Sequence, residues 1–280
     1  MAKLLEGSIL AEKIKEGIKL QAASLKSKPV LVSILVGDDP GSAAYVKSQA
    51  KTAESLGIIY KLHQLNRNIS ENVLIDFILN LNADKTVNGI ILQMPLPEAI
   101  DYKLVSERIL PLKDVEGMHP VNAGKLLFGQ ANMVACTAGA VMELLNSTGV
   151  DLYGKEAVVV GHSEIVGKPL ALLLLEKFAT VTVCHIATSK AQKLEEHVRR
   201  AEVLIVAVGS PGLIKGEWIK KGAIVVDVGI NCQDDKIVGD VEFAEAEKRA
   251  SYITPVPGGV GPLTVAILMR NLVEAAKLQQ

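Results

Sequence analysis

The sequence predicts a two-domain α/β protein whose C-terminal half is a Rossmann-type, doubly wound nucleotide-binding domain, and three observations carry this prediction. First, short apolar runs rich in β-branched residues alternate with longer helical patterns, which is the rhythm of βαβ units. Second, the 280 residues are enough to form two hydrophobic cores of ordinary size. Third, hydrophobic residues make up 49% of the chain and aromatic residues only 4%, so Ala, Val, Ile and Leu must fill the interior, as in parallel sheets.

The first block of the chain alternates strand and helix patterns. Residues 30–36 and 87–93 are predicted strands, because β-branched residues fill both runs and turn residues bound them. Residues 58–65 form a third candidate strand. Ser70 is the predicted N-cap of the helix that follows it, because its hydroxyl can accept a hydrogen bond from the first helical turn. The helical patterns of this block cover residues 7–25, 42–56 and 70–82.

The second block begins after Val121-Asn122 and repeats the βαβ pattern. A last helix over residues 264–277 follows a loop rich in Pro and Gly. We therefore expect a first domain over residues 1–119 and a nucleotide-binding domain over residues 120–280, with the helix of residues 264–280 packing back on the first domain. The predicted strands of the second block are residues 157–160, 180–184, 203–208 and 223–228.

Composition excludes several classes of protein. Lys and Arg number 30 against 31 Asp and Glu, a balance that argues against a nucleic-acid partner, since such binders usually carry a basic excess. The three cysteines are far apart and the five histidines lack metal-ligand spacing, so no metal site is expected. The apolar run 170–175 is too short to cross a membrane, and Glu6 comes too early for a signal peptide. We expect a cytoplasmic protein.

A glycine-rich turn follows the strand of residues 157–160. Gly161 allows the tight turn, Gly167 allows close packing, and the next helix directs its first N–H groups at an anion. Glycine is also common in such turns without a ligand, so the position inside a βαβ run is what favours a nucleotide site. Two further strand ends bring small and polar residues to the same carboxyl edge. The predicted cofactor-binding residues of these segments are Gly161, His162, Ser163, Ile165, Val166, Gly209, Ser210, Gly229 and Ile230.

The end of the second strand bears on which dinucleotide is bound. An NAD site usually has Asp or Glu here, because a carboxylate holds the ribose hydroxyls. Residues 184–190 of this chain contain no acidic residue. The sequence therefore favours NADP over NAD as cofactor, and His185, Thr188 and Ser189 join the predicted cofactor-binding residues.

One predicted helix presents a polar stripe. Ser42, Tyr45 and Gln49 are spaced at i, i+3 and i+4 intervals, so they share one helical face. Lys47 and Lys51 lie two positions from Gln49 and are expected to be solvated charges on the surface.

Five segments resemble signatures of the methylenetetrahydrofolate dehydrogenase/cyclohydrolase family, and together they extend over nearly the whole chain. The most specific segment is T-P-V-P-G-G-V-G-P-L-T at 254–264, which is similar to the family's P-V-P-G-G-V-G-P-x-T loop. The others are V-G-D-D-P at 36–40 with the helix that follows, Q-M-P-L-P at 93–97, K-D-V-E-G at 113–117 and N-A-G-K-L at 122–126.

The resemblance implies roles for individual residues. Tyr45 would stack on the folate ring system, Gln93 would hydrogen-bond near the reacting centre, and Glu116 would hold the pterin ring. The expected catalytic set is thus Tyr45, Gln49, Gln93 and Glu116. The resemblance also implies a homodimer joined through the nucleotide domain. The expected substrate-binding residues are Ser42, Tyr45, Gln93, Pro95, Glu116, Pro257, Gly258, Gly259 and Pro262, and Thr264 joins the cofactor-binding residues.

The chain departs from the family pattern at three places. Gln49 stands where the family has a catalytic Lys, and an amide cannot carry or relay a proton at neutral pH as an amine can. Glu116 replaces an Asp, which moves the carboxylate outward by one methylene. Residues 135–140 read A-C-T-A-G-A where the family reads P-C-T-P-x-G, so the segment loses two stiffening prolines.

These observations lead to a central hypothesis and two alternatives. The hypothesis is an NAD(P)-dependent methylenetetrahydrofolate dehydrogenase with weak or absent cyclohydrolase activity, so that a separate cyclohydrolase would complete the pathway. The first alternative is a fully bifunctional enzyme, in which Gln49 orders a water and another group moves the proton. The second is a catalytically silent regulatory protein that binds folate and nucleotide.

Overall fold

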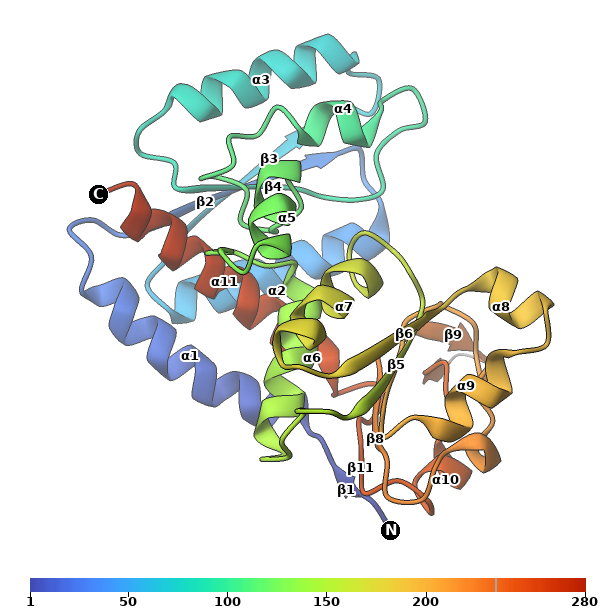
Figure 1. The fold of residues 1–280 in the computed structure, drawn as a ribbon. Helices are drawn as coiled ribbons and strands as arrows, with labels where there is room; N and C mark the ends of the chain where they lie inside the picture. Colours follow the sequence, from blue (N-terminus) through green and yellow to red (C-terminus); the bar gives the residue numbers. More distant parts are fainter. Residues whose placement is uncertain (235) are drawn as a thin grey trace. The chain divides into compact units, whose positions relative to one another are not determined.

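The computed structural model describes residues 1–234 and 236–280, which form two compact units. One unit, called here the nucleotide unit, consists of residues 1–12 and 135–264. The other, the substrate unit, consists of residues 13–134 and 265–280. Helices α1 (Gly7–Ala23) and α11 (Val260–Leu278) each contribute residues to both units (Figure 1). Residues 1–12 of the first half thus belong to the nucleotide unit, and residues 265–280 of the second half belong to the substrate unit.

The substrate unit contains a three-stranded parallel sheet in the order β3-β2-β4. Its central strand β2 (Val30–Val36) is buried at every position, because helices cover both faces of the sheet. Strand β3 (Ile59–Leu65) confirms the candidate strand, and β4 (Gly89–Leu92) is shorter than the predicted run. Ser33 of β2 pairs in register with Ile91 of β4.

The two faces of this sheet differ in polarity. Helices α3 (Glu71–Ala83) and α4 (Tyr102–Ser106) cover one face, where apolar residues of β2 and β4 pack against Leu74 and Ile78 (Figure 1). Helix α2 (Pro40–Ser55) covers the opposite face. Because side chains alternate along a strand, that face receives Ser33 as well as Gln93, which follows β4.

Helix ends in this unit are capped by side chains. The Ser70 hydroxyl accepts a hydrogen bond from Val73 N, which confirms the predicted N-cap. At the other end of α3, buried Lys113 Nζ donates to the backbone carbonyls of Leu81, Asn82 and Asp84. Desolvation lowers the pKa of Lys113. The three carbonyls hold its ammonium in place, and this fixes the start of the segment that carries Glu116. A short helix α5 (Pro120–Leu127) completes the unit.

The nucleotide unit is built on a six-stranded sheet whose paired strands all run parallel. The strand order is β1-β11-β8-β7-β5-β6. In chain order from β5 this is the 2-1-3-4-5 order of doubly wound folds, which places a topological switch point between β5 and β7. The strands are β1 (Lys3–Leu4), β5 (Glu156–Val160), β6 (Thr180–Cys184), β7 (Val203–Val206), β8 (Ile224–Asp227) and β11 (Tyr252–Ile253).

Helices lie on both faces of this sheet (Figure 1). Helices α6 (Cys136–Ser147) and α7 (Gly167–Glu176) cover one face, and α9 (Leu194–Arg200) and α10 (Phe243–Ala246) the other. The remaining elements are the short helix α8 (Ile186–Lys190), the 3-10 turn Gly216–Trp218, and an antiparallel pair formed by β9 (Asn231–Gln233) and β10 (Lys236–Val238). The predicted doubly wound nucleotide-binding fold is confirmed.

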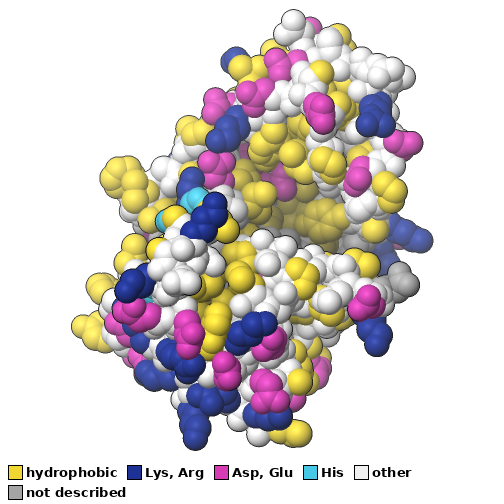
Figure 2. Space-filling model, turned by 90° about the vertical axis from the view of Figure 1, so that its right-hand side faces the viewer, with side chains coloured by type: hydrophobic (Ala, Val, Ile, Leu, Met, Phe, Trp, Pro, Cys, Tyr) yellow, Lys and Arg dark blue, Asp and Glu magenta, His cyan; other side chains and the backbone are white. Residues whose placement is uncertain are grey.

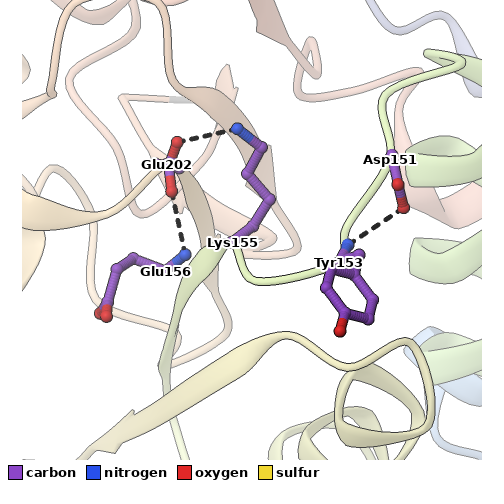
Figure 3. A network of polar contacts seen from close by, with 5 residues as sticks. All are labelled: Asp151, Tyr153, Lys155, Glu156 and Glu202. Atoms are coloured by element: carbon purple, nitrogen blue, oxygen red, sulfur yellow. Dashed lines mark hydrogen bonds and ion pairs between the residues drawn. The ribbon is translucent and has the colours of Figure 1, made fainter.

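Hydrogen bonds of Glu202 join the amino ends of β5 and β7, at the edge of the sheet opposite to the carboxyl ends of the strands. Glu202, just before β7, accepts hydrogen bonds from Lys155 Nζ at 2.9 Å and from Glu156 N at 3.1 Å (Figure 3). The Lys155 bond comes first among the causes that lower the pKa of Glu202. Nearby, Asp151 accepts from Tyr153 N at 3.0 Å in the turn that leads into β5 (Figure 3).

The surface agrees with the balanced composition. On the face that Figure 2 shows, Lys and Arg side chains are interspersed with Asp and Glu side chains, without a continuous field of one sign. Among the helices of the described residues, none is long and apolar enough to span a membrane. The three cysteines are reduced, two of them buried and Cys232 exposed.

Candidate active site

The turn after β5 is as tight as its two glycines suggest. Gly161 has a backbone φ of 121°, a value that residues with a side chain rarely adopt. A Cβ at this position would collide with the carbonyl of Ala207. A Cβ on Gly167 would collide with the Gly161 carbonyl and with His162 Cα. Both positions therefore require glycine for the close approach of backbone segments.

A pocket of about 370 Å³ opens at the carboxyl ends of β5, β6 and β7. It lies at the switch point of the sheet, where ligands bind in open α/β folds. The pocket brings together six of the residues predicted to bind the cofactor: Gly161, His162, Ser163, His185, Ser189 and Ser210. The predicted residues Ile165, Val166 and Gly209 belong to the same loops, and Thr188 lies in the short helix α8.

Two imidazoles stand at this pocket. The rings of His162 and His185 have centroids 5.1 Å apart and planes inclined by 48°. His185 also caps α8, because its Nδ1 accepts from Ala187 N and its backbone N–H donates to Thr188 Oγ1. Thr188 is thus engaged in helix capping. Of the described residues that line the pocket, none is Asp or Glu.

A second pocket of about 210 Å³ lies beside β8 in the same unit. It joins Gly229 and Ile230, predicted for the cofactor, to the Pro/Gly-rich loop predicted for the substrate. Gly258 of that loop has φ of 107°. Thr264 donates to the Val260 carbonyl within α11. The loop residues lining this pocket include Pro257, Gly258, Gly259 and Pro262.

The loops around these pockets are held by a carboxylate that the sequence analysis did not identify. Asp240 Oδ2 accepts from Val208 N at 2.8 Å and from Gly209 N at 3.0 Å. Its Oδ1 accepts from Ser210 N at 2.7 Å and from Asn231 Nδ2 at 2.9 Å. Asp240 is fully buried, and its four bonds tie the loop after β7 to the loop after β8.

A second buried carboxylate supports the first. Asp227 accepts from the backbone N–H groups of Gly229, Asp240 and Val241. Burial, with Asp240 nearby, raises the pKa of Asp227 to about 6 despite these bonds. Gly229 leaves room for this arrangement, since a Cβ there would collide with the Asp240 carboxyl. Two features of the sequence could have indicated this arrangement: Asp227 at the end of a buried strand, and the Gly239-Asp240 pair that follows later in the chain.

In the substrate unit, Ser42 joins α2 to the segment that follows β4. Asp39 caps α2 and accepts from Ser42 N at 2.8 Å. Ser42 Oγ lies 2.6 Å from the Met94 carbonyl, to which it donates. Pro95, predicted to bind substrate, follows Met94 through a cis peptide bond and is exposed.

Gln49 is at the centre of a buried polar cluster. Its Oε1 accepts from Tyr60 OH and from Gln93 Nε2, both at 3.0 Å. Gln93 Nε2 also contacts Ser33 Oγ at 2.9 Å. Gln49 is fully buried, yet its Nε2 has no hydrogen-bond partner within residues 1–234 and 236–280. A buried donor left unpaired typically costs ~1–3 kcal/mol.

Tyr45 of the predicted stripe and the two neighbouring lysines, which lie off the stripe, have the exposure that helical spacing predicts. Tyr45 is half-buried on α2, and Lys47 and Lys51 are exposed. The structure thus confirms that these two lysines are surface charges and does not place an ammonium in the cluster around Gln49.

Glu116 carries an unusual carboxyl. Its side chain is half-buried in the substrate unit, and Leu92 N–H bonds to the carboxyl. Desolvation, reinforced by the neighbouring Asp114, raises the pKa of Glu116 to about 8. The group can therefore hold a proton near neutral pH.

Comparison with known proteins gives matches over both units. The model for the tetrahydrofolate dehydrogenase/cyclohydrolase catalytic domain matches residues 5–116, and the model for that family's NAD(P)-binding domain matches residues 135–280. The bifunctional protein FolD of Acetivibrio thermocellus is 50% identical over 282 aligned residues, which cover 99% of this chain and 98% of the relative.

Two solved structures are similar over almost their whole length. The bifunctional FolD enzyme of Campylobacter jejuni has a TM-score of 0.96 at 48% identity and covers 100% of both chains. The Trypanosoma brucei methylenetetrahydrofolate dehydrogenase-cyclohydrolase, solved with NADP and an inhibitor, has a TM-score of 0.94 at 38% identity. It covers 99% of this chain and 98% of its own.

Replacement of Asp240 tests the role of its four hydrogen bonds. Asp240→Asn puts an amide NH2 against backbone N–H donors, so we expect the loops to loosen and dinucleotide affinity to fall about tenfold or more. Isothermal titration with NADP and NAD measures the affinity, and Asp151→Asn at an exposed position of the same unit is the control. Unchanged affinity would show that the loops keep their shape without this carboxylate.

The raised pKa of Glu116 predicts a pH dependence of stability. Its folded-state pKa of about 8 exceeds the ordinary value of 4.5, so the folded protein binds this proton more tightly than the unfolded chain. Between these two pH values the unliganded protein loses stability as pH rises. Glu116→Gln should therefore gain melting temperature relative to the parent across this window.

Thermal unfolding of both proteins from pH 5 to pH 9 measures this difference. The exposed Glu98→Gln variant is the matched control. A Glu116→Gln difference that stays constant with pH would contradict the elevated pKa.

Proposed function

The chain belongs to the tetrahydrofolate dehydrogenase/cyclohydrolase family, and from this premise we propose that it oxidises methylenetetrahydrofolate with NAD(P)⁺ and has little cyclohydrolase activity. The observation that carries the second part is the buried amide of Gln49, which stands where the family resemblance expects a catalytic Lys. The intact loops of the nucleotide unit support the first part.

The dehydrogenase step requires no acid–base side chain. A C–H bond of the methylene bridge breaks, its electron pair moves with the hydrogen to the nicotinamide ring, and a methenyl cation remains. This step depends on alignment of two carbons and needs no proton transfer. In the proposal, Tyr45 stacks on the folate, Gln93 hydrogen-bonds near the reacting centre and Glu116 holds the pterin ring.

The cyclohydrolase step requires a side chain that can transfer protons. Water adds to the methenyl cation and the ring then opens, so protons must leave the water and reach a ring nitrogen. Loss of a positioned acid–base group typically costs a factor of ~10²–10⁴ in rate, or roughly 3–5 kcal/mol of barrier. The Gln49 amide has no titrating proton to offer at neutral pH.

One observation favours the fully bifunctional alternative. Glu116 has a pKa of about 8 and bonds to the backbone of Leu92, one residue before Gln93. A carboxyl that titrates near neutral pH is the kind of group that can move a proton in place of Lys. In that case Glu116→Gln would abolish hydrolysis while Gln49→Lys would add little.

Substitution of Gln49 tests the proposal directly. Gln49→Lys is expected to raise the rate of methenyltetrahydrofolate hydrolysis by a factor of about 10² or more, because it restores a group that can cycle protons. Loss of methenyltetrahydrofolate is followed against the buffer rate. Gln64→Lys, on the exposed surface of the same unit, is the matched control.

Cofactor reduction by Gln49→Lys and its melting temperature establish that the variant is folded. A folded variant with no gain in hydrolysis would show that Glu116 or another part of the site limits the reaction. Reduction of cofactor by the parent protein on adding methylenetetrahydrofolate eliminates the silent binding protein.

For the cofactor we propose a preference for NADP over NAD. The pocket after β5 offers two imidazoles and, within the described residues, no carboxylate to hold free ribose hydroxyls. We expect a higher kcat/KM with NADP in paired assays. His162→Ala should lower kcat/KM for NADP by about threefold to tenfold and leave that for NAD nearly unchanged. A preference for NAD, or equal losses with both cofactors, would contradict this assignment.

A further inference from the structure

Tyr60 of β3 contacts the buried amide at the centre of the proposed substrate site. Its hydroxyl donates to Gln49 Oε1 at 3.0 Å, and its side chain is half-buried on a strand that is otherwise largely exposed. We propose that Tyr60 is a positioning residue that turns the Gln49 amide so that its Nε2 donates to the folate substrate. This inference rests on the proposed dehydrogenase function.

The orientation of the amide follows from the groups around it. Gln49 Oε1 receives two donors, Tyr60 OH and Gln93 Nε2, and Gln93 Nε2 is itself next to Ser33 Oγ. The reverse orientation would require both amides and the hydroxyls to turn together. Burial raises the pKa of Tyr60, so its phenol remains a proton donor at neutral pH.

The remaining donor of Gln49 explains why this orientation matters. Nε2 is buried and, within the described part of the chain, has no protein partner. Buried donors are normally paired, so this one needs an acceptor, and in the proposal the bound substrate supplies it. The chemistry that satisfies an amide N–H₂ is a carbonyl oxygen or an unprotonated ring nitrogen, and a pterin ring offers both.

The same geometry separates the role of Gln49 from that of a Lys. A Lys ammonium donates in three directions and needs no neighbour to orient it, whereas an amide presents a donor on one side only. Tyr60 is therefore important only as long as residue 49 is Gln. Removal of the Tyr60 hydroxyl leaves the amide with one restraint, and substrate binding should weaken although hydride transfer from bound substrate proceeds.

A double-mutant cycle tests this dependence. Tyr60→Phe, Gln49→Met and the combined variant are compared with the parent by steady-state cofactor reduction with methylenetetrahydrofolate as the varied substrate. We expect Tyr60→Phe to raise KM about twofold to tenfold with kcat nearly unchanged. In the Gln49→Met background, the same substitution should change KM by less than about twofold. Tyr153→Phe, at an exposed position of the nucleotide unit, is the matched control.

The outcomes separate this inference from the proposed function. A parent protein that reduces no cofactor with methylenetetrahydrofolate would reject the proposed function itself. An active parent in which Tyr60→Phe has the same effect on KM in both backgrounds would overturn only the positioning role, since a merely structural tyrosine acts independently of residue 49. A fall in kcat with unchanged KM would overturn it as well.

Discussion

The burial of the Gln49 amide is the constraint on which the proposed chemistry of the substrate unit depends. Buried polar groups in proteins are normally paired, and here Tyr60 and Gln93 donate to the Gln49 amide oxygen while Ser33 Oγ contacts Gln93 Nε2. An ammonium at the same position would require the Tyr60 hydroxyl and the Gln93 amide to turn their acceptor oxygens toward it. The cluster therefore suits a group that accepts two hydrogen bonds, as the Gln amide oxygen does and a Lys ammonium cannot.

In the nucleotide unit the buried polar groups are carboxylates, and they too are paired with hydrogen-bond donors. Asp240 and Asp227 accept seven hydrogen bonds between them, six from backbone N–H groups and one from Asn231. Because a buried carboxylate is costly when it lacks donors, these bonds fix the loops after β7 and β8 before any ligand arrives. In the proposed function, this rigid carboxyl edge holds the cofactor, and residues of the substrate unit determine which of the two reactions proceeds.

Much of this organisation could be predicted from the sequence, and the failures have physical reasons. Hydrophobic periodicity located the main strands and helices, and the motif at 161–167 located the pocket at the switch point. The two-residue strands β1 and β11 were missed because so short a segment has no period. Asp240 and Tyr60 were missed because their importance lies in contacts with residues distant in sequence, which no local pattern encodes.

The proposed function requires that hydrolysis of the methenyl group be much slower than hydride transfer in this protein. The most direct measurement follows both products in one reaction started with methylenetetrahydrofolate and NADP⁺. We expect methenyltetrahydrofolate to accumulate mole for mole with reduced cofactor and to disappear only at the rate set by the buffer. Formation of the ring-opened formyl product as fast as cofactor is reduced would contradict it.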